Sequence, residues 1–458
     1  MSAPLNSDGD APPATGDLFE FAGHSVDAAA GLITLRYTFA GGPVFCEELD
    51  FGTSFEGLPA QTRAAIDRAA SVLHAIAGVS YYKLFAQERL DLGDLALSDF
   101  AREFIAQTYR SGLAEFAHRN SISLKHRLNF EGGRKLGAFV PTRTQNAAKS
   151  LVLIGGGKDS LVSLAAMQAA KADFALFAVN PRAPMIKAAE AAGVPLLSVK
   201  RSLDPQLFEW NERPETLNGH VPITAIVSLI ATIAALVHGY GNIILSNERS
   251  ADEPTLVSDG EAVNHQYSKS TQFEIDLAKL IAQDVDASLG YFSLLRPLSE
   301  AHIARLFAKR DDFDGIFTSC NRAFALRDRP DALWCGDCAK CRFTFLLLAP
   351  AMDKERLLAI FPHNLLDDPD QEQGYRDLMG IGLHKPWDCV GEERESALTL
   401  ALLATNPDWR DMAIVKRLGA ELSITPDALE AGLEEILTPA NASLPGSFND
   451  LILAYAKL

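Results

Sequence analysis

The sequence predicts an α/β fold, in which a parallel sheet with flanking helices is preceded by a small α+β domain and followed by a helical region. Three observations support this prediction. Short alternating segments occupy residues 18–51, strands alternate with helices from residue 149, and the chain is helical in character after residue 396. The chain is therefore divided into a disordered tail (1–17), an α+β domain (18–145), an α/β domain (146–395) and a C-terminal helical region (396–458).

The first domain begins with strands and continues with helices. Residues 19–26, 32–40 and 44–52 alternate apolar with polar residues and are rich in aromatic side chains, which is typical of a small antiparallel sheet. Apolar residues at helical spacing then predict a helix over 58–85, with Pro59 near its start and Gly78 near its end, and a second helix over 97–119.

The α/β domain is predicted from a regular exchange of strand and helix patterns. Strands alternating with helices indicate a parallel sheet that is covered on both faces. The predicted strands are 150–154, 174–179 and 195–199, and the intervening helices are 160–172 and 183–193.

The segment 221–246 contains no Asp, Glu, Lys or Arg and therefore raises the question of a membrane span. Its apolar run is shorter than the about 20 residues that a transmembrane helix requires. The run stops at "HGYG", and the short strand "NIILS" follows. We interpret the segment as a buried helix that leads into a central strand, and we expect no association with a membrane.

The overall charge restricts the partners of the protein. The 42 Lys and Arg residues are outnumbered by 59 Asp and Glu residues, which gives a net charge of -17. Such a field repels nucleic acid, whose affinity depends mainly on neutralised phosphates, so we expect no nucleic-acid partner. The N-terminus has neither the basic segment nor the apolar core of a signal peptide, which predicts a cytoplasmic protein. The sequence leaves the oligomeric state open.

The stretch "LVLIGGGKDS", residues 151–160, is the clearest functional motif. A predicted strand runs into three glycines, and a predicted helix begins directly after them. This arrangement is typical of phosphate binding, because bare backbone N–H groups and a helix N-terminus can approach an anion closely. The spacing is neither GxxxxGK[ST] nor GxGxxG. The alternative is a plain tight turn, which the adjacent Asp159 and Ser160 disfavour.

Four of the six cysteines form a second motif. Two overlapping CxxC steps and a more distant thiol are typical of tetrahedral zinc coordination in a chain without an export signal. Gly336 eases the CxxC turn, and four ligands fill the coordination sphere, so we predict a structural zinc site. An iron–sulfur cluster and four unliganded thiols are the alternatives. The predicted ligands are Cys320, Cys335, Cys338 and Cys341.

Polar residues gather after the strand that ends at Ser246, where parallel sheets bind their ligands. Among them, Glu248 is a candidate ligand for Mg²⁺. His265 and Lys269 are candidates for binding phosphate or moving protons, although a single histidine is more often structural.

Two further groups are candidates for a substrate site. Cys389 lies outside the metal set, and its thiolate can remove the α-proton of an amino acid if His384 or Lys385 lowers the pKa of the thiol. The alternative is a buried small apolar side chain. Seven basic residues between Arg119 and Lys149 can receive a polyanionic small molecule, and a solvated surface is the alternative there.

The glycine loop resembles the SGGxDS signature of the PP-loop ATP pyrophosphatases, with Gly155 in place of the first Ser. This resemblance implies the adenine nucleotide α-hydrolase-like fold and cleavage of ATP to AMP and pyrophosphate. It makes Asp159 and Lys158 candidates for catalysis, with Lys158 at the variable position adding charge. The residues that would hold the pyrophosphate end of ATP are Gly155, Gly156, Gly157, Asp159 and Ser160.

Five stretches together resemble the UDP-N-acetylmuramoyl-L-alanyl-L-glutamate epimerases of peptidoglycan synthesis: "LVLIGGGKDSLVSL", "SNERSA", "VNHQYSKS", "WCGDCAKCRF" and "HKPWDCVGE". The resemblance implies ATP-dependent inversion of the terminal L-glutamate of UDP-MurNAc-L-Ala-L-Glu through a carboxyl adenylate, with release of AMP and pyrophosphate. The UDP-muramoyl dipeptide is then the small-molecule partner, and Cys389 and His384 are the candidates for proton transfer.

Two other functions match parts of the sequence. The cysteine motif also resembles that of the 7-cyano-7-deazaguanine synthases, which makes nucleobase or tRNA modification one alternative. The extra N-terminal domain and the acidic charge disfavour its tRNA version. The other alternative is a non-catalytic protein that binds an adenine nucleotide and zinc, which the intact Asp159–Ser160 pair disfavours.

Overall fold

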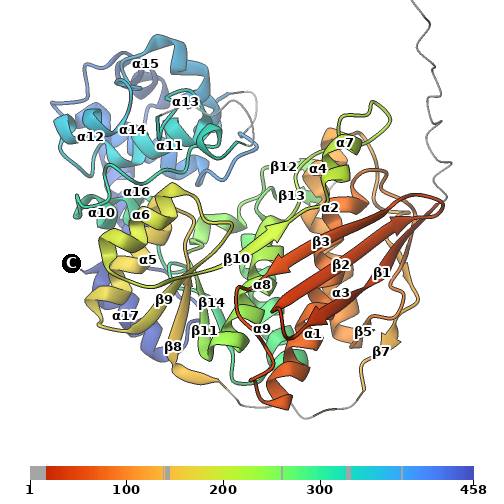
Figure 1. Ribbon diagram of the computed structural model, residues 1–458. Helices are drawn as coiled ribbons and strands as arrows, with labels where there is room; N and C mark the ends of the chain where they lie inside the picture. Colours follow the sequence, from red (N-terminus) through yellow and green to blue (C-terminus); the bar gives the residue numbers. More distant parts are fainter. Residues whose placement is uncertain are drawn as a thin grey trace, which may run out of the picture. The chain divides into compact units, whose positions relative to one another are not determined.

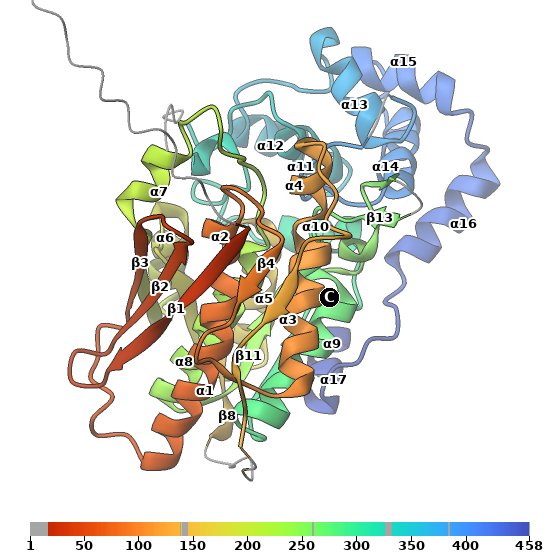
Figure 2. The same cartoon turned by 90° about the vertical axis from the view of Figure 1, so that its right-hand side faces the viewer.

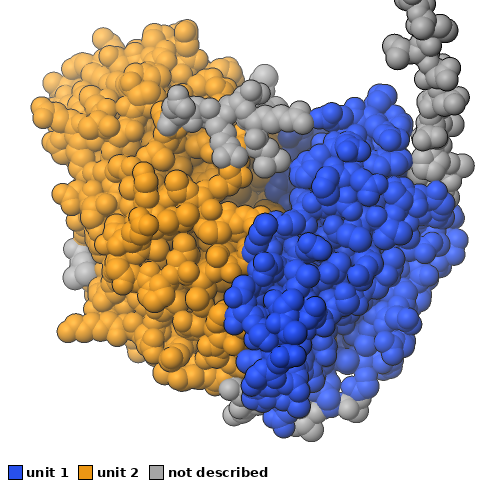
Figure 3. All heavy atoms as spheres, in the orientation of Figure 1, with its two compact units in different colours: residues 1–140, 200–221 blue, residues 141–199, 222–458 orange. Residues whose placement is uncertain are grey.

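The computed structural model describes residues 17–137, 139, 145–258, 261–325, 332–382 and 385–457. The chain forms two compact units, coloured separately in Figure 3: unit 1 comprises residues 1–140 and 200–221, and unit 2 comprises residues 141–199 and 222–458. Unit 1 is therefore discontinuous in sequence, because the chain builds the first part of unit 2 before it returns. The tail predicted over 1–17 lies outside the described residues as far as residue 16, and the predicted domain boundaries stay predictions.

Unit 1 contains the predicted antiparallel strands, which are confirmed. β1 pairs with β2 and β2 with β3, both antiparallel, and β4 and β6 continue the sheet in parallel beyond β1. On the other edge, the end of β10 pairs antiparallel with β3. The strands are β1 (Leu18–Asp27), β2 (Leu32–Phe39), β3 (Val44–Asp50), β4 (Arg89–Asp91), β6 (Asn129–Glu131) and the last residues of β10 (Leu196–Ser202).

The helices of unit 1 differ from the prediction at one point. The first helix is bounded by Pro59 and Gly78 as predicted, and a short turn of helix follows it. The helix predicted over 97–119 is broken at Leu113, whose φ of -103° is not helical. Gly112 precedes this break, and glycine has a low helix propensity. The elements are α1 (Ala60–Ala77), α2 (Val79–Tyr82), α3 (Asp99–Gly112), α4 (Ala114–Arg119) and α7 (Pro205–Trp210), with a two-stranded pair of β5 (Ala96–Leu97) and β7 (Arg134–Lys135).

Unit 2 is built on a parallel sheet, which confirms the α/β prediction. The strand order is β14–β11–β8–β9–β10, and each of these neighbouring pairs is parallel. The chain goes from β8 through β9 to β10 on one side, and then returns to place β11 on the other side of β8. The strands are β8 (Asn146–Leu153), β9 (Asp173–Val179), β10, β11 (Tyr240–Leu245) and β14 (Gly290–Ser293).

Helices cover both faces of this sheet, as predicted (Figure 1). One face packs against α5, α6, α10 and α17, whose apolar residues share a core with Val152, Leu176 and Ile244 of the strands. The other face contacts α8 and α9. The helices are α5 (Lys158–Ala169), α6 (Ala183–Ala192), α8 (Ile223–His238), α9 (Thr271–Leu280), α10 (Glu300–Ala308) and α17 (Gly446–Ala456).

The uncharged segment 221–246 forms α8 and then β11, which confirms the predicted buried helix and inner strand. Most of α8 is buried, and it contacts β8, β9 and β11. Among the described helices, none combines the length and the apolar character that crossing a membrane requires.

The last part of unit 2 is helical, as predicted from residue 396 onward. α13, α14 and α15 contact one another (Figure 2), and α17 returns against α5. A small hairpin and a π-helical turn complete unit 2. The elements are β12 (Leu256–Ser258), β13 (Glu261–Val263), η3 (Ile281–Val285), α11 (Ala339–Leu348), α12 (Lys354–Ile360), α13 (Glu372–Leu378), α14 (Glu393–Thr405), α15 (Ala413–Leu422) and α16 (Pro426–Leu437).

A buried ion pair attaches the returning segment of unit 1 to the first strands. The Arg201 guanidinium, at the end of β10, donates hydrogen bonds to the two carboxylate oxygens of Glu47 on β3 at 2.7 and 3.1 Å. It also donates to the Ser80 hydroxyl at 3.3 Å. Glu47 is fully buried, so each charge depends on the other for its stabilisation.

We expect Glu47→Ala to lower the free energy of unfolding by about 3–5 kcal/mol, because it leaves the Arg201 charge buried without a partner. Urea denaturation followed by circular dichroism measures the change. Glu48→Ala is the matched control, because Glu48 is exposed on the same strand and its loss should cost no more than about 0.5 kcal/mol. Equal stability of the two variants would contradict the prediction.

Candidate functional site

The glycine loop connects β8 to α5, as predicted. Gly156 has a φ of +82°, which disfavours any residue with a side chain. A Cβ atom at this position would also lie 3.0 Å from the Cβ of Pro184. Gly157 is the N-cap residue of α5, and Lys158 is its first residue. The loop therefore requires glycine at its centre and leads directly into a helix N-terminus.

Ser160 holds the loop in shape through two hydrogen bonds. Its hydroxyl donates to the backbone oxygen of Gly157 at 3.0 Å and accepts from the backbone N–H of Gly155 at 3.3 Å. The backbone N–H of Thr318 donates to the oxygen of Gly156 at 2.9 Å and supports the loop from another segment. These three hydrogen bonds fix the backbone of the loop and leave the space above it open.

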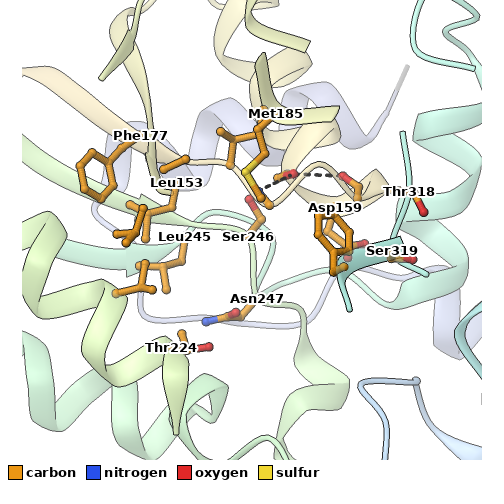
Figure 4. Close-up of a pocket in the computed structure, with 18 of the residues that line it drawn as sticks. Leu153, Asp159, Phe177, Met185, Thr224, Leu245, Ser246, Asn247, Thr318 and Ser319 are labelled. Atoms are coloured by element: carbon orange, nitrogen blue, oxygen red, sulfur yellow. Dashed lines mark hydrogen bonds between the residues drawn. The ribbon is translucent and has the colours of Figure 1, made fainter. Parts of the chain in front are cut away.

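A cavity of about 480 Å³ lies over the glycine loop. Leu153, Phe177 and Leu245 gather at one end of it, and Asp159 and Ser319 lie at the other (Figure 4). The cavity thus has an apolar end and a polar end. Its lining is Leu153, Ile154, Gly155, Gly157, Asp159, Ser160, Phe177, Ala178, Val179, Met185, Thr224, Val227, Leu245, Ser246, Asn247, Thr318, Ser319, Asn321, Phe324 and Lys340.

The strand order explains the position of this cavity. The chain leaves β8 toward β9 and β10 on one side, and the connection after β10 crosses to β11 on the other side, so a crevice opens at the carboxyl ends of β8, β9 and β11. The three strands end at Leu153, Val179 and Leu245, and all three residues line the cavity. Ser246 and Asn247, at the end of β11, line the cavity, and their role in binding a ligand stays a prediction.

Lys158 does not line the cavity. Its side chain is buried, and its ammonium forms ion pairs with Glu300 and, at 2.5 Å, with Asp159. Although burial lowers the pKa of Lys158, the two carboxylates raise it more, so the ammonium stays charged. Burial and the nearby Asp159 charge raise the pKa of Glu300, and the Lys158 ammonium opposes this rise by stabilising the carboxylate. The positive charge of Lys158 is therefore paired with two carboxylates and does not face the cavity.

Side chains from distant parts of the sequence lie around Cys389. The Lys269 ammonium and the His265 ring lie close enough to the Cys389 sulfur to act on its charge. Although burial raises the pKa of the Cys389 thiol, Lys269, Lys340 and His265 lower it more, to about 6. Burial lowers the pKa of Lys269, but the Cys389 and Glu248 charges raise it more. The structure thus brings together Glu248, His265, Lys269 and Cys389, which are scattered in the sequence.

Of the two cations that the sequence suggested beside Cys389, Lys385 does not act on the thiol among the described residues, where Lys269, Lys340 and His265 do. Lys385 forms an ion pair with Glu253 instead. His384 lies outside the described residues, so its predicted role in proton transfer stays a prediction. Glu248 is buried and accepts a hydrogen bond from the Ser250 hydroxyl at 2.9 Å.

The four predicted metal ligands converge. The sulfur atoms of Cys320, Cys335, Cys338 and Cys341 all lie within 4.8 Å of one another, and individual pairs are 3.5, 3.7 and 3.9 Å apart. Tetrahedral zinc with Zn–S bonds of about 2.3 Å separates its sulfurs by about 3.8 Å. Gly336, with a φ of +74°, makes the turn between two of the ligands, as predicted. The donor set and its spacing fit a single tetrahedral ion.

The cysteine cluster is connected to the glycine loop through Thr318. Besides its bond to Gly156, Thr318 donates its hydroxyl to the oxygen of Leu333 at 2.6 Å and accepts the N–H of Cys320 at 3.0 Å. The neighbouring Asn321 donates its side-chain amide to Asp388, beside Cys389. One segment therefore contacts the glycine loop, the cysteine cluster and the segment that carries Cys389.

Sequence reasoning missed several residues of the site. Thr318, Ser319 and Asn321 flank Cys320, and Lys340 lies between Cys338 and Cys341. Their proximity in sequence to predicted metal ligands is the signal that could have identified them. Thr224, from the first turn of α8, has no such signal.

Three of the seven basic residues from Arg119 to Lys149 form ion pairs with nearby acidic residues. The Arg127 guanidinium donates to the backbone oxygen of Ala86, and Arg143 lies outside the described residues. A role of this stretch in binding a polyanion stays a prediction. The ion pairs within unit 1 are Arg119–Glu115 at 3.0 Å, Lys135–Asp99 at 2.9 Å and Arg134–Asp94 at 3.9 Å.

Comparison with known protein families identifies the chain. The MurL N-terminal domain matches residues 11–294, and the MurL C-terminal domain matches residues 316–432. This protein belongs to the MurL epimerase family. The resemblance predicted from the five sequence stretches is thereby confirmed, and the MurL family member is an isomerase.

Three relatives named UDP-N-acetyl-alpha-D-muramoyl-L-alanyl-L-glutamate epimerase are similar over most of their length. The protein from Micromonospora sp. is 42% identical over 88% of this chain and 90% of its own. The protein from Xanthomonas oryzae pv. oryzae is 39% identical over 92% and 93%, respectively. The protein from Salinispora tropica is 40% identical over 93% of both chains.

We expect the purified protein to contain one tightly bound zinc ion, and Cys338→Ser to lose it together with part of the thermal stability, because metal binding contributes to folding. Elemental analysis and thermal unfolding measure the two effects. Cys46→Ser, which changes an exposed cysteine, is the control that keeps the zinc. Iron with acid-labile sulfide in the purified protein would contradict the zinc assignment.

We expect the rate of Cys389 alkylation by iodoacetamide to rise with pH and to be half-maximal near pH 6, because the thiolate is the reactive form. Lys269→Met removes a neighbouring cation and should move the midpoint upward by about one pH unit. Peptide mass spectrometry measures Cys389 and, as an internal control, the exposed Cys46, which should not respond to Lys269→Met. A midpoint of about 8.5, as in an ordinary thiol, would contradict the prediction.

Proposed function

We propose that this MurL family member inverts the terminal L-glutamate of UDP-MurNAc-L-Ala-L-Glu to D-glutamate in an ATP-dependent step of peptidoglycan synthesis. The substrate is suggested by the names of the three relatives. The observation that carries the ATP-dependent part is the cavity over the glycine loop, with its apolar and polar ends. The adenine base would occupy the apolar end, and the phosphates would lie over the loop.

Adenylation overcomes a specific barrier in this reaction. A carboxylate makes the neighbouring C–H bond very weakly acidic, because loss of the proton would place a second negative charge beside the first. Transfer of AMP to the α-carboxylate, with release of pyrophosphate, removes that charge and creates an acyl group that can delocalise a carbanion. After the proton is returned on the opposite face, water cleaves the acyl adenylate and releases AMP.

We assign the removal of the α-proton to Cys389. Its thiolate is stabilised by Lys269, Lys340 and His265, so the base is already ionised near neutral pH. The segment that contains Cys389 is connected to the cavity lining through the Asn321–Asp388 hydrogen bond. In this proposal, the glutamate α-carbon of the adenylate lies beside this thiolate. His384 stays the sequence candidate for the second proton-transfer group.

The metals would have separate roles. Zinc, held by Cys320, Cys335, Cys338 and Cys341, would be structural, since four thiolates leave no position for substrate. A multi-iron cluster would spread the same thiolates over separate irons, and the short sulfur spacings therefore favour one ion. Asp159 would hold the Mg²⁺ of the nucleotide, because its carboxylate lines the cavity whereas that of Glu248 is buried and bonded to Ser250.

The test follows two products in one mixture. The protein is incubated with ATP, Mg²⁺ and UDP-MurNAc-L-Ala-L-Glu in D₂O, and AMP and deuterium at the glutamate α-carbon are measured. We expect AMP to form and deuterium to enter a D-glutamate product. AMP without deuterium would point to another fate of an adenylate, such as nucleobase modification. Nucleotide binding without AMP would favour the non-catalytic alternative.

Asp159→Asn should reduce AMP formation at least about tenfold in the same assay, because it removes the carboxylate beside the phosphates, and one lost charged contact of about 1.4 kcal/mol corresponds to a factor of ten. Asp311→Asn, an equivalent change at an exposed position of unit 2, is the matched control and should retain full activity. Full activity of Asp159→Asn would contradict the assignment of the glycine loop to ATP.

A further inference from the structure

The cavity presents an electrostatic problem for the nucleotide that we have proposed. ATP carries several negative charges, and the only lysine within the glycine loop, Lys158, directs its ammonium to Glu300 and Asp159. Asp159 adds a further negative charge to the polar end of the cavity. The Mg²⁺ that we assign to Asp159 would offset part of the phosphate charge, and a cation from another part of the chain would offset more of it.

Lys340 is the lysine that lines this cavity. Among the lining residues named above, it is the sole Lys, Arg or His. It lies in the first turn of α11, between the metal ligands Cys338 and Cys341, and its side chain is partly buried. It shares the lining with Gly157, Asp159 and Ser319, which mark the polar end.

We propose that Lys340 is the cation that binds the phosphate chain of the nucleotide, and that the cysteine cluster serves the reaction by fixing this lysine at the cavity. The proposal rests on the proposed ATP-dependent function and adds to it a nucleotide-binding residue from outside the glycine loop. Ligation of Cys338 and Cys341 on either side would restrict the backbone of Lys340, which lowers the entropy lost when its long side chain becomes ordered.

The same ammonium also acts on Cys389. Lys340 is one of the two lysines whose charge stabilises the Cys389 thiolate. A single side chain therefore faces both the nucleotide cavity and the base. When the adenylate is present, Lys340 would bind its phosphate, and the glutamate carbon joined to that phosphate would lie on the side of the cavity where Cys389 is found.

The test compares ligands with and without phosphates. Lys340→Met should weaken binding of a non-hydrolysable ATP analogue at least tenfold, whereas binding of adenosine, which has no phosphates, should change less than twofold. Titration calorimetry measures both ligands in the presence of Mg²⁺. A second readout is the alkylation profile of Cys389, whose midpoint should move to higher pH in Lys340→Met.

Two control variants and a metal determination accompany the titrations. Lys340→Arg keeps the charge and should restore most of the affinity. Lys187→Met removes the same charge from an exposed position on α6 and should leave the affinity unchanged. The zinc content of each variant is determined, because a metal site disturbed by the substitution would weaken ATP analogue and adenosine alike.

The outcomes separate this inference from the proposed function. A wild-type protein that does not bind the ATP analogue would overturn both. A wild-type protein that binds it, together with a zinc-loaded Lys340→Met that binds equally well, would overturn the inference and leave the ATP-dependent function intact. Equal weakening by Lys340→Met and Lys340→Arg at full zinc content would also overturn it, because the charge would then not be the cause.

Discussion

The buried ion pair between Lys158 and Glu300 connects the main parts of unit 2. Lys158 begins α5 directly after the glycine loop, and Glu300 begins α10. Glu395 on α14 accepts the N–H of Ala301 at 2.6 Å, which brings a third helix to the same place. Two ions are costly to bury separately, so the pair forms only if α5 and α10 are correctly placed. The interaction therefore fixes the start of α5 and the glycine loop before it, over which we propose that the nucleotide binds.

The segment after Cys389 packs on the same carboxylates. A Cβ atom at Gly391 would lie 2.7 Å from Phe343, 2.9 Å from Glu395 and 3.2 Å from Glu300, so any larger residue would require these side chains to shift. The segment that carries Cys389, which we assign as the base, thus packs against Glu300, the partner of Lys158. The proposed nucleotide binding and the proposed proton transfer would therefore depend on one small buried cluster, although its residues span more than two hundred positions in the sequence.

Local patterns in the sequence predicted much of the fold. The β8–α5 loop, the uncharged helix α8 and the three antiparallel strands were predictable because their apolar spacing and glycines lie within a few residues. The return of the chain to unit 1 was not predictable, because the β10–β3 pairing joins Lys200 to Asp50 and leaves no trace in local periodicity. The prediction of one continuous helix over 97–119 was wrong at Leu113, because Gly112 is the one local signal of the break.

The site shows the same contrast. The four cysteines were identifiable because three of them lie within seven positions, and the glycine loop because its residues are consecutive. The partner of Lys158 was not, because Glu300 resembles any other glutamate until the fold brings it to the loop. Lys340 stands inside the cysteine motif, but only the cavity distinguishes it from the exposed lysines of unit 2.

The discontinuity of unit 1 has a consequence for synthesis on the ribosome. Residues 1–140 emerge first, but the unit also needs residues 200–221, so about 80 further residues must be made before it can be completed. At about 5–20 residues per second, this delay lasts several seconds. During that time Glu47 lacks its ion-pair partner Arg201, and the edge of β3 lacks its pairing with β10. The first part of unit 2, residues 141–199, must therefore be translated while unit 1 is still unfinished, and the edge of β3 stays unpaired with β10 for that time.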